Sequence, residues 1–120
     1  MALSDDRPED LPPQDGPATV AENEVLRSIG RRARTVNLNR AQRLGELLDQ
    51  ALLRRLAEDE RGEAEGLAHQ IIGSAGTFGY DAASELAVEV EDYLARPGPD
   101  ADRLARAREA VAELVEQLSV

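Results

Sequence analysis

The clearest helical pattern in the chain is the run AEGLAHQIIGSAGTF, which spans residues 64–78. Its apolar residues recur at intervals of three and four, the spacing that places side chains on one face of an α-helix. These residues are Ala64, Leu67, Ala68, Ile71, Ile72, Ala75 and Phe78. The run therefore predicts a helix over 62–78 with one buried face.

Helical periodicity also occurs in four other segments, at residues 20–34, 41–56, 83–94 and 104–118. No segment alternates apolar and polar residues in the manner of a β-strand. Amphipathic helices joined by short links bury their apolar faces most readily as a bundle. We therefore expect an all-α fold, an antiparallel up-and-down four-helix bundle with an additional N-terminal helix at 20–34.

Turn and capping residues indicate where these helices end. Thr19 with Glu22 matches a capping box, and the segment Asn37–Asn39 predicts a break because asparagine favours helix caps. Gly79 predicts the end of the 62–78 helix. The remaining signals are a turn at Asp59–Gly62, an end at Arg96-Pro97-Gly98-Pro99 and a cap at Asp100.

The first 18 residues differ in composition from the rest of the chain. They contain four prolines and five acidic residues but few apolar side chains. Such a segment cannot bury enough apolar surface to fold. We expect a disordered, acidic, proline-rich tail over 1–18 and one helical bundle domain over 19–120.

The composition excludes several classes of function. Among 120 residues, 24 are acidic and 14 are basic, which gives a net charge of -10 that would repel a nucleic acid backbone. All 14 basic residues are arginine and no cysteine is present, so lysine and thiolate chemistry are excluded. A single histidine cannot build a multi-histidine metal site. Without an apolar run of membrane-spanning length or a signal-peptide pattern, we expect no membrane association and a cytoplasmic location.

The single histidine, His69, lies on the polar side of the 62–78 helix. At about 100° per residue it falls roughly 140° from the centre of the apolar face, so we expect its imidazole in solvent. Within about 60° of it lie Gly62, Gly66, Gly73 and Gly76, which leave the approach to the ring open. A neutral imidazole can accept a phosphoryl group and release it again. Two plainer interpretations stay open, in which the histidine is an ordinary solvated residue and the glycines serve helix packing or mark a kink.

The sequence around this histidine reads LAHQIIGSAGTFG over residues 67–79 and is followed by Leu86 and Val90-Glu91. This pattern resembles the histidine-containing phosphotransfer (HPt) domain of two-component phosphorelays. The matching positions are Ala68, His69, Ile71, Gly73, Ser74, Ala75 and Gly79. The resemblance covers roughly residues 20–120. It implies a four-helix bundle with an additional N-terminal helix, in which His69 is the phosphoacceptor that exchanges a phosphoryl group with an aspartate of a receiver domain.

One position departs from the family pattern, because Ile72 occupies the place of the usual lysine. A lysine there would neutralise phosphate charge, whereas isoleucine adds only packing or an apolar docking surface. We expect access and docking around His69 to involve Gly66, Gln70, Ile72, Gly73 and Gly76. Glu65, one turn before the histidine, is expected to be a solvated side chain. No cofactor or metal is expected on this chain, and Mg²⁺ would belong to the partner receiver.

The expected protein is a phosphocarrier rather than a stand-alone enzyme, and it carries no kinase ATP site. Its partners would be a response-regulator receiver domain, a histidine kinase or both, and the chain itself is expected to be a monomer. One alternative is a helical adaptor that binds a receiver or kinase without being phosphorylated. Another is a homodimerising bundle of the histidine-kinase type, which would expose a long apolar seam.

Overall fold

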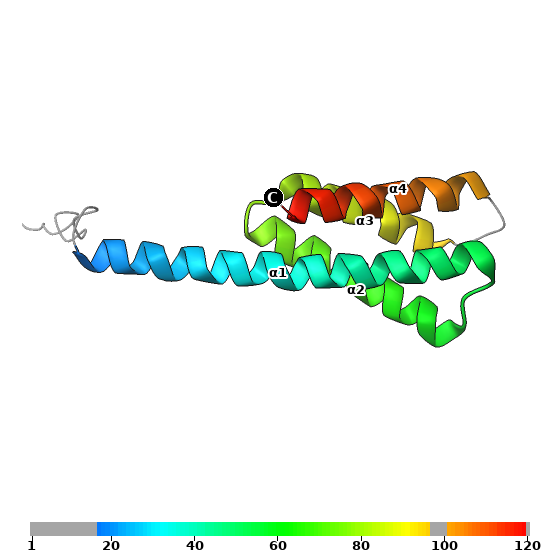
Figure 1. The fold of residues 1–120 in the computed structure, drawn as a ribbon, viewed down its shortest axis with the longest axis horizontal. Coiled ribbons are helices and arrows are strands. Elements are labelled where there is room, and N and C mark those ends of the chain that lie inside the picture. Colours follow the sequence, from blue (N-terminus) through cyan, green and yellow to red (C-terminus); the bar gives the residue numbers. More distant parts are fainter. Residues whose placement is uncertain (1–16, 97–100, 120) are drawn as a thin grey trace, which may run out of the picture. The chain divides into compact units, whose positions relative to one another are not determined.

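The computed structural model describes residues 17–96 and 101–119, which form four α-helices (Figure 1). No strand occurs in this part of the chain. The helices are α1 (Pro17–Leu53), α2 (Glu58–Thr77), α3 (Asp81–Ala95) and α4 (Ala101–Leu118). They follow one another up and down in chain order (Figure 1), so the expected all-α, antiparallel four-helix architecture is confirmed.

The chain divides into two compact units, Met1–Arg31 and Arg32–Val120. The described part of the first unit is the beginning of α1, and the second unit contains the rest of α1 together with the other three helices. None of the helices in the described ranges is long and apolar enough to cross a membrane.

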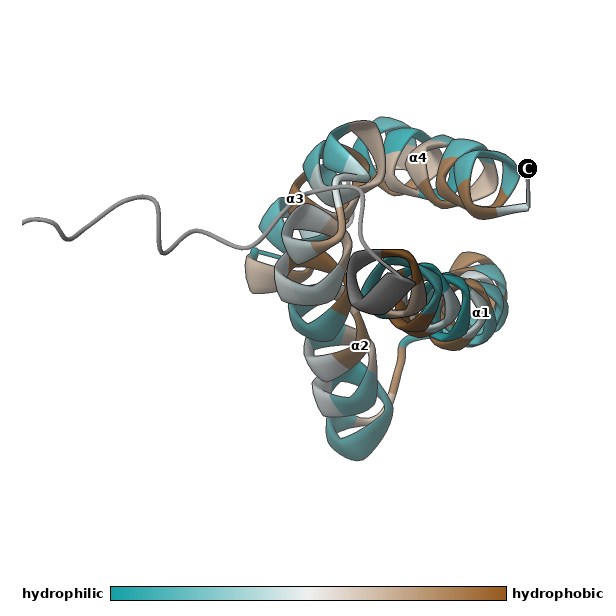
Figure 2. Cartoon of the chain, turned by 90° about the vertical axis from the view of Figure 1, so that its left-hand side faces the viewer, coloured by the Kyte–Doolittle hydropathy of each residue, from teal (hydrophilic) through white to brown (hydrophobic). Residues whose placement is uncertain are grey.

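The core of the second unit is built from aliphatic side chains and alanines. Figure 2 shows the apolar residues of its helices turned toward the space between them. Small residues let the helix backbones approach closely, and a Cβ placed on Gly45 of α1 would lie 3.4 Å from Cγ1 of Val111 on α4. The largest buried apolar side chains are Leu44, Leu47, Leu48, Ile71, Val90, Leu94, Val111, Leu114 and Leu118. In α2, the predicted apolar face is buried at Ala64, Ala68, Ile71 and Ala75.

The expectation of a separate N-terminal helix at 20–34 is wrong, because this helix is not separate. That segment is helical, but it continues without a break into the rest of α1, which also begins two residues before the expected cap. Asn37 does not cap a helix, because its side chain is buried and bonded elsewhere. Its Nδ2 donates to Ser74 Oγ on α2 at 3.1 Å, and its Oδ1 accepts from Arg40 Nη1 at 2.9 Å. Because Ser74 on α2 and Arg40 on α1 satisfy its polar atoms, the asparagine has no need of the backbone amides that a cap would use.

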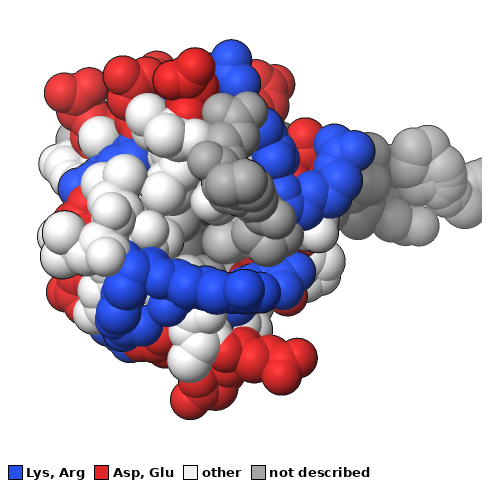
Figure 3. Space-filling view, turned by 90° about the vertical axis from the view of Figure 1, so that its right-hand side faces the viewer, with Lys and Arg blue, Asp and Glu red and all other residues white. Residues whose placement is uncertain are grey.

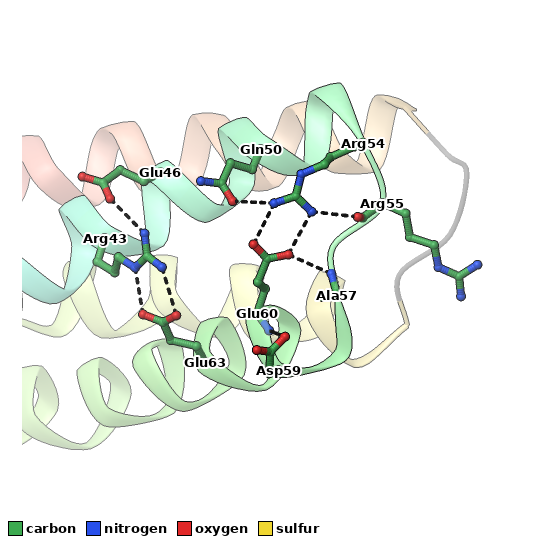
Figure 4. Close-up of polar contacts among 9 residues, drawn as sticks. All are labelled: Arg43, Glu46, Gln50, Arg54, Arg55, Ala57, Asp59, Glu60 and Glu63. Atoms are coloured by element: carbon green, nitrogen blue, oxygen red, sulfur yellow. Dashed lines mark hydrogen bonds and ion pairs between the residues drawn. The ribbon is translucent and has the colours of Figure 1, made fainter.

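The expected turn at Asp59–Gly62 is also wrong, since α2 already begins at Glu58. Acidic side chains in the first turn of a helix are favourable because they face its exposed amides. The carboxylate of Glu60 accepts a hydrogen bond from the Ala57 backbone N–H at 2.8 Å and two from the Arg54 guanidinium at 2.9 and 2.7 Å (Figure 4). These contacts lower the pKa of Glu60 to about 2. The acidic run therefore starts the helix.

Ion pairs continue along the α1 and α2 surfaces. Arg43 donates Nε and Nη2 to the Glu63 carboxylate at 2.8 and 3.0 Å, and Nη1 to Glu46 at 3.1 Å (Figure 4). On the end of the molecule seen in Figure 3, a band of basic side chains lies between acidic groups. Ion pairs between exposed side chains add little stability. The pair between Arg43 and Glu63 nevertheless joins α1 to α2 at this level of the two helices.

The end of α2 agrees with its sequence signal. Gly79 has φ of 84°, and the Tyr80 N–H donates to the Ala75 carbonyl at 2.8 Å, which closes the helix in the left-handed manner that glycine permits. The helix itself ends at Thr77, so Phe78 lies beyond the predicted apolar face and is 39% exposed.

The disordered tail expected over 1–18 is wrong at Pro17 and Ala18, which already belong to α1, and its residues 1–16 lie outside the described residues. The end expected at Arg96-Pro97-Gly98-Pro99 agrees with α3 ending at Ala95, whereas residues 97–99 and the cap at Asp100 lie outside the described residues.

Candidate functional site

His69 stands on the outer face of α2. The residues that α2 turns inward, Ala68, Ile71 and Ala75, are fully buried, whereas the imidazole is 79% exposed. The expected position of the ring in solvent is therefore confirmed. An exposed ring on a rigid helix is accessible to a second macromolecule.

The glycines around His69 have different surroundings. A Cβ built on Gly66 or Gly73 would meet no atom within 4 Å, and the same holds for Gly62. A Cβ on Gly76 would lie 3.6 Å from Ser84 Oγ, an ordinary van der Waals contact. Packing within this chain therefore does not require glycine at 66 or 73, although each lowers helix stability by about 1 kcal/mol relative to alanine. Both residues are exposed, and α2 is continuous through them.

In the described part of the chain, the polar partner of the imidazole is Glu91 on α3. His69 Nδ1 lies 3.1 Å from Glu91 Oε2, and the glutamate side chain is 38% exposed. A carboxylate can only accept a hydrogen bond when ionised, so the contact favours the tautomer with hydrogen on Nδ1 and a lone pair on Nε2. The atom left open to solvent is then the nucleophilic one.

Sequence reasoning gave Glu91 no role, although a signal for it exists. Because α2 and α3 are antiparallel and joined by a short turn, residues equally distant from that turn lie opposite one another. Ser84 and Gly76 face each other across Tyr80, and His69 and Glu91 are both eleven positions from the same residue. Once the stop at Gly79 is recognised, the spacing therefore indicates Glu91 as the neighbour of the histidine.

The other site residues lie at different depths. Gln70 is exposed, whereas Ile72 is half-buried and packs against the core, with its backbone carbonyl accepting a hydrogen bond from Ser84 Oγ at 3.0 Å. Glu65 lies 3.6 Å from Arg61 Nε through its Oε2. It is therefore Glu91, from the neighbouring helix, that contacts the imidazole.

The surroundings of the histidine are acidic rather than basic. The position that would carry a lysine is Ile72, and Glu91 is the charged side chain in contact with the ring. Across residues 17–96 and 101–119, no group of three or more histidine or carboxylate side chains is arranged to hold a metal ion. Within the described residues, the site therefore consists of an exposed imidazole with a carboxylate at its Nδ1.

A helical bundle that presents one oriented, accessible imidazole on its second helix has the architecture of a phosphotransfer domain. The family model described as Hpt domain matches residues 32–119, so the chain belongs to the Hpt family. The matched range begins where the second compact unit begins. Comparison with curated proteins and with solved structures found no match. Membership supports a general role in two-component phosphorelays.

Proposed function

We propose that His69 carries a phosphoryl group on Nε2 and exchanges it with an aspartate of a response-regulator receiver domain. The observation that carries this proposal is the contact between Glu91 Oε2 and His69 Nδ1 at 3.1 Å, on a ring that is otherwise exposed. The carboxylate occupies the Nδ1 side and leaves Nε2 as the open nucleophile.

The transfer is chemically balanced with the residues present. The Nε2 lone pair attacks the phosphorus of the receiver's aspartyl phosphate, an N–P bond forms, and the P–O bond to the aspartate breaks with release of its carboxylate. The proton on Nδ1 stays in place, hydrogen-bonded to Glu91, which stabilises the positive charge that develops on the imidazole. The reverse reaction returns the phosphoryl group to an aspartate. The Mg²⁺ that assists such transfer would be held by the receiver.

Access to Nε2 is the second requirement of this mechanism. A receiver has to bring its aspartate to within bonding distance of the ring, and Gly66 and Gly73 add no side chain to the surface that it approaches. Gln70 supplies an exposed polar group on the same helix. Ile72, packed against the core, supports α2 and adds only its exposed edge to docking.

A second candidate function is an adaptor that binds a receiver or kinase without being phosphorylated. The observation favouring it is the isoleucine at position 72, because the described surroundings of the ring then lack the lysine that would neutralise an incoming phosphate. The oriented tautomer of His69 favours the phosphocarrier, since an adaptor has no use for an open nucleophilic nitrogen.

The decisive experiment incubates the protein with phosphorylated receiver domains of its own genome and measures acid-labile phosphate on this chain. We expect labelling of the wild type and of Glu65→Gln, whose side chain lies beside Arg61 rather than the ring, and loss of labelling in His69→Gln. Because the chain has only one histidine, phosphohistidine detected by mass spectrometry has a single possible position. Receiver binding without labelling would establish the adaptor instead.

A further inference from the structure

Arg40 on α1 is a cation without a carboxylate partner in the described part of the chain. Its Nη1 donates to Oδ1 of the buried Asn37 at 2.9 Å, and no ion pair with a described residue accompanies this bond. By contrast, the guanidinium groups of Arg43, Arg54 and Arg61 lie 2.8, 2.7 and 3.6 Å from a glutamate oxygen. A guanidinium carries several N–H donors, and the bond to a neutral amide uses only part of them.

Two contacts between α1 and α2 show that this arginine lies level with His69 along the bundle. Asn37 Nδ2 donates to Ser74 Oγ at 3.1 Å, and Arg43 Nε donates to Glu63 Oε2 at 2.8 Å. Position 40 is the midpoint of 37 and 43, and position 69 is within one residue of the midpoint of 63 and 74. At about 100° per residue, the arginine also lies between its two neighbours around α1, about 60° from each, on the side that contacts α2.

The bare surface beside His69 leads toward this side of α1. Around α2, Gly73 and Gly66 lie about 40° and 60° from His69, in the direction of Ser74, which α1 contacts. A Cβ on either glycine would meet no atom within 4 Å. Glu91 reaches the ring from α3, which packs against α2 in the other direction. A partner therefore approaches Nε2 over the glycines, along the border between α2 and α1.

We propose that Arg40 is a docking contact for the phosphorylated aspartate of the receiver and supplies the positive charge that Ile72 lacks. This role rests on the proposed function, since it takes a receiver as the partner. The phosphoryl group arrives with negative charge at a ring whose contacting side chain is the carboxylate of Glu91, so a cation at the border of the approach favours the complex. A guanidinium suits this role because its planar N–H groups bind phosphate oxygens in pairs. The bond to the buried Asn37 holds the guanidinium in place and so reduces the side-chain entropy lost on docking.

The test is rapid-quench transfer from a phosphorylated receiver to the full chain over a range of receiver concentrations. A docking contact is made equally before and during the chemical step, so its loss raises KM and leaves kcat unchanged. For Arg40→Gln we expect the second-order rate constant of transfer to fall by about tenfold at low salt, whereas the rate at saturating receiver stays within about twofold of the wild type. The dependence of the second-order constant on salt should become less steep, because one attractive charge is removed.

Two further variants separate charge from structure. Arg40→Lys keeps the charge and should recover most of the lost rate. Arg55→Gln is the matched control, because Arg55 is an exposed arginine on the linker before α2 and its side chain extends into solvent (Figure 4). At about 1.5 Å per residue, the start of α2 is about 16 Å from His69, so Arg55→Gln should transfer like the wild type. Circular dichroism of each variant verifies that the bundle is folded.

Failure of this role can be distinguished from failure of the proposed function. A labelled wild type together with unchanged transfer in Arg40→Gln, or an equal loss in Arg55→Gln, overturns the role of Arg40 and leaves the phosphocarrier in place. A wild type that no receiver labels overturns the phosphocarrier, and binding of receivers loaded with beryllofluoride, a stable mimic of the phosphoryl group, then decides on Arg40. Weaker binding by Arg40→Gln than by Arg55→Gln supports the docking contact, whereas equal binding, or no binding by any receiver, refutes it.

Discussion

Replacing Gly66 and Gly73 by alanine separates the stability of α2 from its function. Both residues lie inside the helix, and a Cβ at either position would meet no atom within 4 Å. The substitution therefore removes the backbone entropy cost of glycine without creating a clash. We expect each alanine to stabilise the bundle by about 1 kcal/mol. For a domain of this size, that raises the melting temperature by about 5 °C per substitution.

The same substitutions should impair phosphotransfer. At about 1.5 Å rise per residue, Gly66 and Gly73 lie about 5 and 6 Å along the helix axis from His69, on the same side of α2. A methyl group there stands where the receiver surface has to approach the ring. Displacing reacting groups by about 1 Å can reduce a rate by a factor on the order of 100, so we expect the transfer rate to fall by about 10- to 100-fold.

The assay is rapid-quench transfer from a phosphorylated receiver, combined with thermal unfolding of each variant. Gly62→Ala is the control, since its Cβ also meets no atom within 4 Å but it lies about 10 Å from His69 along the axis. It should stabilise the bundle and leave transfer nearly unchanged. If Gly73→Ala raised stability and transferred at the wild-type rate, the argument that glycine provides access would be refuted.

Four further outcomes follow from individual contacts. Glu91→Gln keeps an oxygen that can accept from Nδ1 but removes the charge, so rapid-quench transfer should slow by about tenfold, whereas Glu65→Gln should transfer normally. Ile72→Lys should lengthen the lifetime of the phosphohistidine, measured as loss of acid-labile label, and an unchanged lifetime would exclude a charge deficit at this site. Asn37→Ala removes the hydrogen bonds to the half-buried Ser74 and Arg40, each worth about 1 kcal/mol, so urea unfolding should show a loss of about 2 kcal/mol. The pKa of Glu60 is lowered to about 2 in the folded chain, so its contribution to stability is present above its ordinary value of 4.5 and is lost as the pH falls toward 2; this acid-dependent loss should be absent in Glu60→Gln.

The sequence was sufficient to predict the core of the bundle and the exposure of the histidine. Burial of Ala64, Ala68 and Ile71 follows from helical spacing alone, because no other arrangement removes all three from water together. The exposure of His69 follows from the same geometry. Such predictions succeed because they depend on the period of the helix rather than on neighbouring elements.

The errors arose where a polar side chain is hydrogen-bonded to a residue outside its own helix. Asn37 has the chemistry of a cap, but its amide bonds to Ser74 from a different helix, a contact that local sequence does not reveal. The acidic run that includes Glu60 has the composition of a turn, yet the Arg54 guanidinium makes it the start of α2. At Asn37 a tertiary hydrogen bond decides the local structure, and at Glu60 a hydrogen bond from the preceding linker does so.

The candidate site combines a local feature with a long-range one. Exposure of His69 is a property of α2 alone, whereas orientation of its ring requires Glu91 to lie at the same level on α3. That level is set by the turn at Gly79, whose positive φ ends one helix and allows the next to start at Asp81. The spacing of eleven residues on each side of Tyr80 then brings the carboxylate to Nδ1. The chemistry of the imidazole therefore depends on a glycine three turns away along the helix, which explains how a turn without reactive groups contributes to the reactivity of the site.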